Sequence, residues 1–351
     1  MNPLDSAIQN CIQDAIARNV FPGGVIGYSR NNELRTLAFG RLTYDESAPP
    51  VTAETVYDLA SITKSIPTAS LILMLVDQGK LGLDDQVVRY IPELTSQGSE
   101  AIRVRHLLSF TTVFDLRRPL SSYAEEGTSA ILKRVFTSPL RFPVGTNVLY
   151  SDIPYILLGL IAERVSNTPL DVLADTTFFQ PLNMAHTTFH PDKLTDSVIA
   201  PTEVVEGKDI VGITHDEKAR VFYNEGLITG HAGLFSTVGD LLTYCQMTLN
   251  RGVWDGTRYF TQASLQLMQT EVTHDDDLGF SLGWTTHAAY MGPELPAGTF
   301  GKSGFTGTLI VISPQVQKSL VLLTNRTYPR RPESPDAINS VRQHLVRLIF
   351  S

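Results

Sequence analysis

Apolar residues near both ends of the chain recur roughly every three or four positions, as on the buried face of an amphipathic helix. Near the N-terminus these positions are Leu4, Ile8, Cys11, Ile12, Ala15 and Ile16. Near the C-terminus they are Ile338, Val341, Leu345, Leu348 and Ile349. The pattern predicts a first helix capped by Asp5 or Ser6, and a last helix over residues 335–350.

Strand-like runs lie just inside these two helices. Residues 24–30 and 31–42 form a predicted hairpin that turns at Asn31-Asn32. Residues 299–314 and 317–327 are two further strand-rich runs, separated by a short turn that contains proline. A helix followed by antiparallel strands is typical of an α+β protein rather than of an alternating βαβ chain.

The middle of the chain has a helical pattern. Residues 61–78 predict an apolar helix that ends at Gly79, and further helices are expected over residues 152–165 and 237–250. We therefore expect an antiparallel sheet, flanked by the N- and C-terminal helices, with a helical lobe inserted. The expected division is a sheet domain of residues 1–65 and 216–351 and a mainly helical domain of residues 66–215, with the active site between them.

Composition excludes several classes of protein. Hydrophobic residues make up 42% of the 351 residues and charged residues 18%, which favours a large core over disorder. The net charge of −8, without a block of Lys or Arg, argues against a nucleic-acid partner. Cys11 and Cys245 lie far apart in no metal-binding or redox spacing, so we expect packing roles for them and no metal or cofactor.

The N-terminus lacks the basic start and apolar run of a signal peptide. The longest apolar run, residues 69–76, is shorter than the roughly 20 residues of a membrane span. The expectation is a cytoplasmic protein without a membrane span; the alternative is a secreted form whose signal peptide has been removed. The sequence leaves the oligomeric state open.

Ser61 and Lys64 are the first candidate for chemistry. Residues three apart on a helix lie side by side, and Ser61 is the only serine in the chain with a lysine three positions later. A serine hydroxyl becomes a good nucleophile when a neighbouring base takes its proton. The pair therefore predicts a nucleophile, Ser61, and its base, Lys64. The alternative is a helix that simply begins with serine and carries a surface lysine.

Two other short motifs add candidates. Tyr150-Ser151-Asp152 precedes an apolar helix, and a tyrosine beside lysines can shuttle protons; a buried core tyrosine is the alternative. Lys302-Ser303-Gly304 is expected to open an edge strand, where Lys302 and Ser303 would hold a substrate carboxylate. The backbone N–H of the next residue, Phe305, would serve an oxyanion hole. Here the alternative is a turn with a solvated lysine.

Taken in order, these motifs resemble those of the serine β-lactamase and penicillin-binding-protein superfamily, which pairs S-x-x-K with a K-T-G strand far downstream. The closest resemblance is to the class C β-lactamase-like branch, which includes esterases and D-amino-acid peptidases. It extends over nearly the whole chain, through residues 58–64, 104–110, 178–189, 230–241, 279–284, 304–308 and 322–326.

The resemblance implies roles for the candidate residues. Ser61 would be acylated, and Lys64 and Tyr150 would share the proton transfers. Lys302 and Ser303 would bind a carboxylate or assist Tyr150. The backbone N–H groups of Ser61 and Phe305 would form the oxyanion hole. The implied protein is a serine hydrolase that acts through an acyl-enzyme on ester, peptide or β-lactam substrates.

The chain departs from the β-lactamase pattern at Asp152, where β-lactamases carry an asparagine. An ionised carboxylate only accepts hydrogen bonds, and it would raise the pKa of Lys64. We therefore expect a carboxylesterase or D-amino-acid peptidase with slow β-lactamase activity at most. Lys302, which many esterase-like relatives lack, favours a carboxylate-bearing substrate. The alternatives are a non-hydrolytic binding or sensor protein and an acyltransferase. The altered segment Phe110-Thr111-Thr112-Val113 has no consequence that the sequence assigns.

Three other patterns are weaker. Residues 279–283 match the G-x-S-x-G elbow of α/β-hydrolases, with Ser281 as nucleophile and Asp336 and His344 as partners, but lack its strand-turn-helix context. The segment His274 to Asp277 is expected to be a solvated acidic loop rather than a metal site. His215, Asp216, Glu217 and His231 are interpreted as structural or cleft-lining residues.

Overall fold

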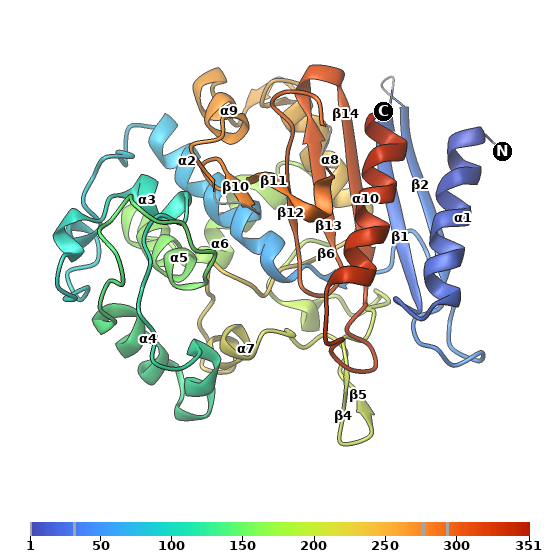
Figure 1. The fold of residues 1–351 in the computed structure, drawn as a ribbon, viewed down its shortest axis with the longest axis horizontal. Helices are drawn as coiled ribbons and strands as arrows, with labels where there is room; N and C mark the ends of the chain where they lie inside the picture. Colours follow the sequence, from blue (N-terminus) through green and yellow to red (C-terminus); the bar gives the residue numbers. More distant parts are fainter. Residues whose placement is uncertain (1, 31–32, 275–277, 293–294) are drawn as a thin grey trace.

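Within the residues that the computed structural model describes (2–30, 33–274, 278–292 and 295–351), both ends of the chain contribute to one antiparallel sheet. The eight strands lie in the order β2-β1-β14-β13-β12-β11-β10-β9. Strand β1 pairs with β14 in the register Val25 to Leu323. Figure 1 shows this sheet running from the blue and red strands at one side of the molecule to the orange strands near its middle, with the helical lobe in cyan and green on the other side.

The strands of the large sheet are β1 (Gly23–Arg30), β2 (Glu33–Gly40), β9 (Thr273–His274), β10 (Leu278–Phe280), β11 (Thr285–Ala288), β12 (Phe300–Ser303), β13 (Leu309–Ser313) and β14 (Lys318–Thr324). The two-stranded pairs are β3 (Tyr57–Asp58) with β6 (Phe235–Ser236), β4 (Val204–Val205) with β5 (Lys208–Asp209), and β7 (Val253–Trp254) with β8 (Thr257–Arg258).

The helices are α1 (Pro3–Ala17), α2 (Ser70–Asp77), α3 (Val104–Leu108), α4 (Thr128–Thr137), α5 (Ile153–Ser166), α6 (Leu170–Ala174), α7 (Glu217–Asn224), α8 (Val238–Leu249), α9 (Gln262–Gln269) and α10 (Asp336–Phe350). The predicted terminal helices are therefore present, although α1 is capped by Asn2 rather than by Asp5 or Ser6. The predicted hairpin is formed by β1 and β2, and its turn residues 31–32 lie outside the described part of the chain.

The sheet separates two apolar cores, because successive side chains of a strand point to opposite faces. On one face Leu320 and Leu322 pack with α1 and α10. On the other face Val321 and Leu323 belong to the larger core, which continues through α8 into the helical lobe. The α+β class predicted from the sequence is confirmed. The predicted division into domains at residues 65 and 216 stays a prediction.

The segment predicted as one helix from Ser61 to Gln78 is interrupted. A 3-10 turn spans Ala60–Lys64, Ile66 has non-helical backbone angles (φ −120°, ψ 113°), and regular α-helix begins only at Ser70. Pro67 accounts for the interruption, since proline lacks an N–H and its ring clashes with the preceding turn. The stretch Ala60–Asp77 has the length and composition of a membrane span, but 78% of it is buried inside the protein, as expected of a core segment.

Two strand predictions were also wrong in detail. The run 299–314 contains two strands, β12 and β13, joined by the turn Gly304–Thr308. Lys302 and Ser303 lie at the end of β12, not at its start, and β12 is not an edge strand because it pairs with both β13 and β11. Glycines at 304 and 307 end the strand, which the sequence-based prediction did not take into account.

Candidate active site

Ser61 lies on a strained turn between the two lobes. The preceding residue, Ala60, has a positive φ of 48°, which is unusual for a residue with a Cβ. Residues with strained backbone angles of this kind are found most often at functional sites. The Asp58 carboxylate accepts from the backbone N–H of Ala60 at 2.8 Å and from that of His215 at 2.7 Å. Asp58 thus fixes the turn by linking its backbone to that of His215, which is distant in the sequence.

The turn between β12 and β13 is tied to the same segment. Thr306 Oγ1 donates to the Asp58 carbonyl at 2.7 Å, and Thr308 Oγ1 donates to the Leu59 carbonyl at 3.1 Å. A Cβ on Gly304 would lie 2.3 Å from the Leu59 carbonyl oxygen, so this close approach requires glycine. The Phe305 N–H in this turn donates to no acceptor among the described residues, which leaves it free for an oxyanion.

Lys64 is fully buried and directs its ammonium at Ser61. Its Nζ donates to Ser61 Oγ at 3.1 Å and to the His231 carbonyl at 3.0 Å, and it forms an ion pair with Asp152 at 2.7 Å. Burial lowers the pKa of Lys64, but the charge of Asp152 and the hydrogen bond to Asp152 outweigh burial and hold this pKa above its ordinary value. With three acceptors around three N–H donors, Lys64 is an ammonium in this state.

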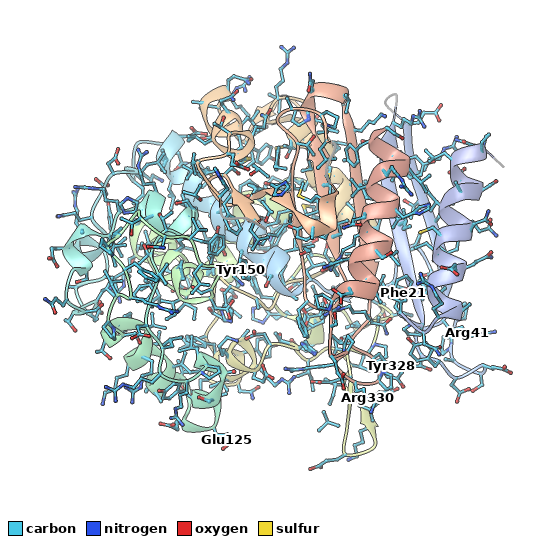
Figure 2. The ribbon with its side chains drawn as sticks, in the orientation of Figure 1. Phe21, Arg41, Glu125, Tyr150, Tyr328 and Arg330 are labelled. Atoms are coloured by element: carbon cyan, nitrogen blue, oxygen red, sulfur yellow. The ribbon has the colours of Figure 1, made fainter. Side chains whose placement is uncertain are left out.

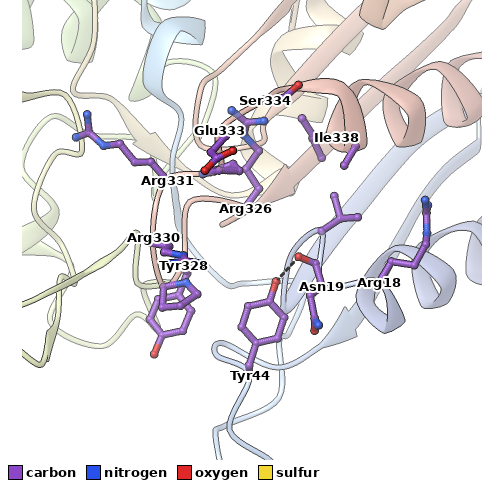
Figure 3. Close-up of a pocket in the computed structure, with 14 residues that line it drawn as sticks. Arg18, Asn19, Tyr44, Arg326, Tyr328, Arg330, Arg331, Glu333, Ser334 and Ile338 are labelled. Carbon is purple, nitrogen blue, oxygen red and sulfur yellow. Dashed lines mark hydrogen bonds between the residues drawn. The ribbon is translucent and has the colours of Figure 1, made fainter.

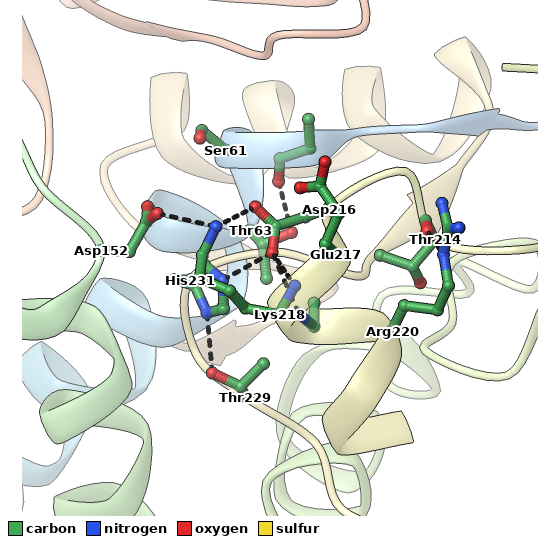
Figure 4. Close-up of polar contacts among 12 residues, drawn as sticks. Ser61, Thr63, Asp152, Thr214, Asp216, Glu217, Lys218, Arg220, Thr229 and His231 are labelled. Carbon is green, nitrogen blue, oxygen red and sulfur yellow. Dashed lines mark hydrogen bonds and ion pairs between the residues drawn. The ribbon is translucent and has the colours of Figure 1, made fainter. Parts of the chain in front are cut away.

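Asp152, at the start of α5, connects Lys64 to a cluster of charged side chains that the sequence analysis did not predict. Its second carboxylate oxygen lies 3.3 Å from Lys218 Nζ, which lies 2.8 Å from Asp216. Asp216 in turn contacts His231 Nε2 at 3.0 Å. Figure 4 shows the Lys218 ammonium between the two carboxylates. We call these five residues, Lys64, Asp152, Lys218, Asp216 and His231, the ion-paired side of the site.

Cations hold the pKa values of both carboxylates well below their ordinary range. Burial raises the pKa of Asp152, but Lys64, His231 and Lys218 together lower it further than burial raises it. Asp216 behaves in the same way, because its contacts with His231 and Lys218 lower its pKa further than burial raises it. Asp152, Asp216 and His231 have the spacing of a metal site, with ligand atoms within 4.8 Å of one another. The Lys218 ammonium already pairs with both carboxylates of that set.

On the opposite side of Ser61, three buried cations have no carboxylate partner among the described residues. They are Lys302 (2% exposed), Arg326 (6%) and Arg342 (4%), which we call the cationic side. Burial, and then the charge of Lys64, hold the pKa of Lys302 well below its ordinary value. Burying an uncompensated charge is costly, so cations of this kind indicate a place for an anionic ligand.

The two arginines are held in position by neutral groups. Arg326 Nε donates to the Phe305 carbonyl at 2.8 Å. Arg342 donates to the Gly304 and Thr308 carbonyls, each at 2.8 Å, and its buried Nε has no partner in the described part of the chain. Burial and the neighbouring Arg326 charge lower the pKa of Arg342. These contacts fix both guanidinium groups behind the turn that carries Phe305.

Tyr150 lies between the two sides. Its ring centroid is 5.2 Å from Lys64 Nζ and 4.4 Å from Lys302 Nζ. The ring centroids of Tyr150 and Phe110 are 4.9 Å apart. Lys302 also lies over the rings of Phe110 and Phe280, so its direct contacts are with aromatic faces, which stabilise its charge, while Asp152 acts on it only through space. The Tyr150 hydroxyl forms no hydrogen bond with any described residue. Tyr150 is half-buried, and Figure 2 shows it between the lobes.

Residues from both sides of Ser61 meet in one pocket of about 280 Å³. It contains Ser61, Tyr150, Lys302, Ser303 and Phe305, together with Arg326, Asn339 and Arg342. The structure therefore brings together all the residues that the motifs singled out, with Asp152 behind Lys64. It adds Arg326, Arg342, Lys218 and Phe110. Phe110 lay in a segment that the sequence analysis had marked as altered, and Arg326 lay in residues 322–326, which carry part of the family resemblance; Lys218 and Arg342 had no local signal.

A larger cavity of about 710 Å³ lies beside the pocket (Figure 3). It contains Tyr44, Tyr328 and Arg330, and it shares Arg326 with the pocket around Ser61. Arg331 at its rim already pairs with Glu217 at 2.5 Å and with Glu203 at 3.6 Å. The larger cavity lacks Ser61, so the smaller pocket is the candidate active site.

The weaker sequence patterns do not form a site. Ser281 is fully buried and donates to the Met268 carbonyl at 2.7 Å, so the α/β-hydrolase interpretation is wrong. His344 lies exposed on α10. Residues 275–277 of the acidic segment lie outside the described residues. Asp216 and His231, interpreted as structural or cleft-lining, belong to the ion-paired side.

Comparisons with known proteins show the family to which the chain belongs. The family model described as Beta-lactamase matches residues 8–343. A protein of Escherichia coli (strain K12), provisionally named D-alanyl-D-alanine carboxypeptidase, is 32% identical over 324 residues, covering 83% of this chain and 73% of the relative.

Solved structures share the fold. A class C β-lactamase superimposes with a TM-score of 0.77 at 20% identity, covering 98% of this chain and 96% of that one. EstCE1, a hydrolase with promiscuous acyltransferase activity, superimposes with a TM-score of 0.77 at 23% identity, covering 98% of each chain. The recognition of this superfamily from the sequence motifs is confirmed.

Proposed function

We propose, from the premise that the chain belongs to the β-lactamase family and is a serine hydrolase, that it releases the C-terminal residue of peptides ending in D-alanyl-D-alanine or a close analogue. Ser61 is the proposed nucleophile. The name of the Escherichia coli relative supports the substrate class. The observation that carries the proposal is the cationic side of the pocket.

The position of the cations restricts the substrate. Ser61 and the three cations line the same pocket of about 280 Å³, so an anionic group bound there lies close to the bond that Ser61 attacks. A C-terminal residue has this arrangement, because its carboxylate is separated from the scissile amide by one carbon atom. An internal peptide bond does not have it. A simple ester without a carboxylate would leave Lys302, Arg326 and Arg342 uncompensated.

The geometry supports the following sequence of steps. The substrate carboxylate enters the cationic side, and the scissile carbonyl oxygen accepts from the backbone N–H groups of Ser61 and Phe305. When Lys64 has lost a proton, its hydrogen bond with Ser61 reverses, and it takes the Ser61 proton as Oγ attacks. The free Tyr150 hydroxyl protonates the leaving amine. Water then attacks the acyl-enzyme carbonyl and gives a proton to the Tyr150 phenolate, the bond between Ser61 Oγ and the acyl group breaks, and Oγ recovers its proton from Lys64.

An esterase is the second candidate. Asp152 is the observation that favours it, because a carboxylate at this position cannot donate to a substrate amide carbonyl as the asparagine of β-lactamases does. An ester needs no such donor. The two candidates differ in what they require from the substrate: the peptidase needs the carboxylate, whereas the esterase does not.

A matched pair of substrates tests the proposal. An N-acylated peptide ending in D-alanyl-D-alanine is compared with the same peptide as its C-terminal amide, and kcat/KM is measured by release of D-alanine or D-alaninamide. We expect the free acid to be cleaved at least about tenfold faster, since one charged hydrogen bond contributes roughly 1.5–3 kcal/mol. The Ser61→Ala variant should cleave neither.

Equal rates for the acid and the amide would overturn the carboxylate requirement. Cleavage of p-nitrophenyl acetate without cleavage of either peptide would support the esterase. Intact-protein mass after brief exposure to benzylpenicillin supplies an independent readout, because this β-lactam also carries a carboxylate next to its reactive amide. We expect an adduct of wild-type protein that Ser61→Ala does not form.

A further inference from the structure

Asp152 divides its carboxylate between two buried lysines. Oδ1 lies 2.7 Å from Lys64 Nζ, and Oδ2 lies 3.3 Å from Lys218 Nζ. Lys218 is 6% exposed and makes its shorter contact, 2.8 Å, with Asp216. The two lysines therefore share the Asp152 carboxylate. Lys218 interacts more closely with Asp216 than with Asp152.

The charged and titratable groups that face Lys64 come from several elements. Asp152 lies at the start of α5, Tyr150 in the loop before it, Asp216 and Lys218 at the start of α7, and Lys302 on β12. His231 contributes its carbonyl to Lys64, while its ring bridges Asp216 and Thr229.

Charge changes at Lys218 and at Asp216 act on Lys64 with opposite sign. Removing the Lys218 cation would leave Asp152 with Lys64 as its one close lysine, and Asp216 without its ammonium. The potential at Lys64 would become more negative, and its proton would be held more tightly. Removing the Asp216 charge would do the reverse, because Lys218 would then be free to neutralise Asp152.

We propose that Lys218 is a positioning residue that acts through Asp152: by sharing this carboxylate it lowers the pH at which Lys64 becomes available as the base for Ser61. Lys218 does not line the pocket around Ser61, so it does not touch the substrate there. The proposal rests on the assignment of Ser61 and Lys64 in the proposed function. It does not rest on the identity of the substrate.

The test is the pH profile of an ester that needs no carboxylate site. kcat/KM for p-nitrophenyl acetate is measured from pH 6 to pH 11, with the Ser61→Ala rate subtracted at each pH. In Lys218→Met we expect the rising limb to move to higher pH by about one unit, which is about a tenfold loss at any pH on the limb. In Lys218→Arg, which keeps the positive charge, the rising limb should lie close to its wild-type pH.

Asp216→Asn provides the opposite change in a variant that is expected to fold. Asp216 caps α7 by accepting from the N–H groups of Lys218 and Ala219, each at 3.0 Å, and asparagine is an equally good N-cap. We expect its limb to move to lower pH by about one unit. Lys133→Met, an exposed lysine on α4, is the matched control for loss of one positive charge and should leave the limb in place.

The proposal is supported if the two limbs move in opposite directions, and it is wrong in every other case. A uniform loss of rate in Lys218→Met without a displaced limb would show a structural role only. If the wild-type protein cleaves the ester in a Ser61-dependent way but cleaves no D-alanyl peptide, the substrate assignment fails while this test remains valid.

Discussion

The two sides of Ser61 bury their cations in opposite ways. On the ion-paired side, Lys64 and Lys218 are 0% and 6% exposed, and each has a carboxylate within 2.8 Å. On the cationic side, Lys302, Arg326 and Arg342 are buried to a similar degree, but no described carboxylate pairs with them. Similar burial with different pairing implies different purposes.

A buried ion pair balances desolvation with an internal partner, so it fixes protonation states and geometry before substrate arrives. A buried cation without a partner is destabilising until a ligand supplies the counter-charge. We therefore expect the ion-paired side to control the chemistry of Ser61, and the cationic side to control which substrate is held next to it. Substitutions on the two sides should differ in their effect on stability as well as on activity.

Lys64→Met should give the largest effect, because it removes the proton acceptor and breaks a buried pair. We expect kcat/KM to fall by about a thousandfold for every substrate, the upper part of the range for loss of a general base. The free energy of unfolding should fall by about 2 kcal/mol. This is less than for an isolated buried ion pair, because Asp152 still contacts the Lys218 ammonium when Lys64 is removed. Enzyme assays and urea unfolding measure the two effects. Unchanged stability would contradict the importance of this pairing.

Lys302→Met should separate stability from activity. We expect the rate with a free-acid D-alanyl peptide to fall by about a hundredfold, and the rate with p-nitrophenyl acetate to change far less. The free energy of unfolding should rise by about 1 kcal/mol, because an apolar side chain replaces an uncompensated buried charge. A loss of stability similar to that of Lys64→Met would remove the distinction between the two sides.

Asp152→Asn tests the shared carboxylate. Asparagine keeps the shape, can donate to a substrate amide carbonyl and no longer stabilises the Lys64 ammonium. We expect the rate of acylation by benzylpenicillin, followed by intact-protein mass, to rise by about tenfold relative to p-nitrophenyl acetate turnover. An unchanged ratio would count against this interpretation of Asp152.

The pH dependence of KM should give the smallest effect. The pKa of Lys302 is lowered, so its amine becomes neutral at a lower pH than that of an ordinary lysine. As pH rises through this range the pocket loses one cation, and KM for a free-acid peptide should rise by about threefold, while KM for its amide should not. A parallel rise for both peptides would assign the effect to another group.

Much of the site was predictable because its motifs are local. Ser61 and Lys64 are three residues apart, Tyr150 and Asp152 adjoin one helix, and Lys302 and Phe305 adjoin one strand. Their roles in catalysis stay predictions, but the structure brings them together as expected. The break at Ile66 and the division of residues 299–314 into two strands were missed, because apolar patterning does not register a proline or a glycine turn within a run.

The sequence by itself determined the α+β class and the pairing of a serine with a lysine, because hydrophobic periodicity and i, i+3 spacing act over a few residues. Only the tertiary structure decided that Lys64 is paired with a carboxylate and that Lys302, within the residues described, is not. Lys64, Asp152 and Lys218 are far apart in the chain, as are Lys302 and Arg342, and their charges matter because folding removes them from water. That electrostatic difference between the two sides of Ser61 is not encoded in any short motif.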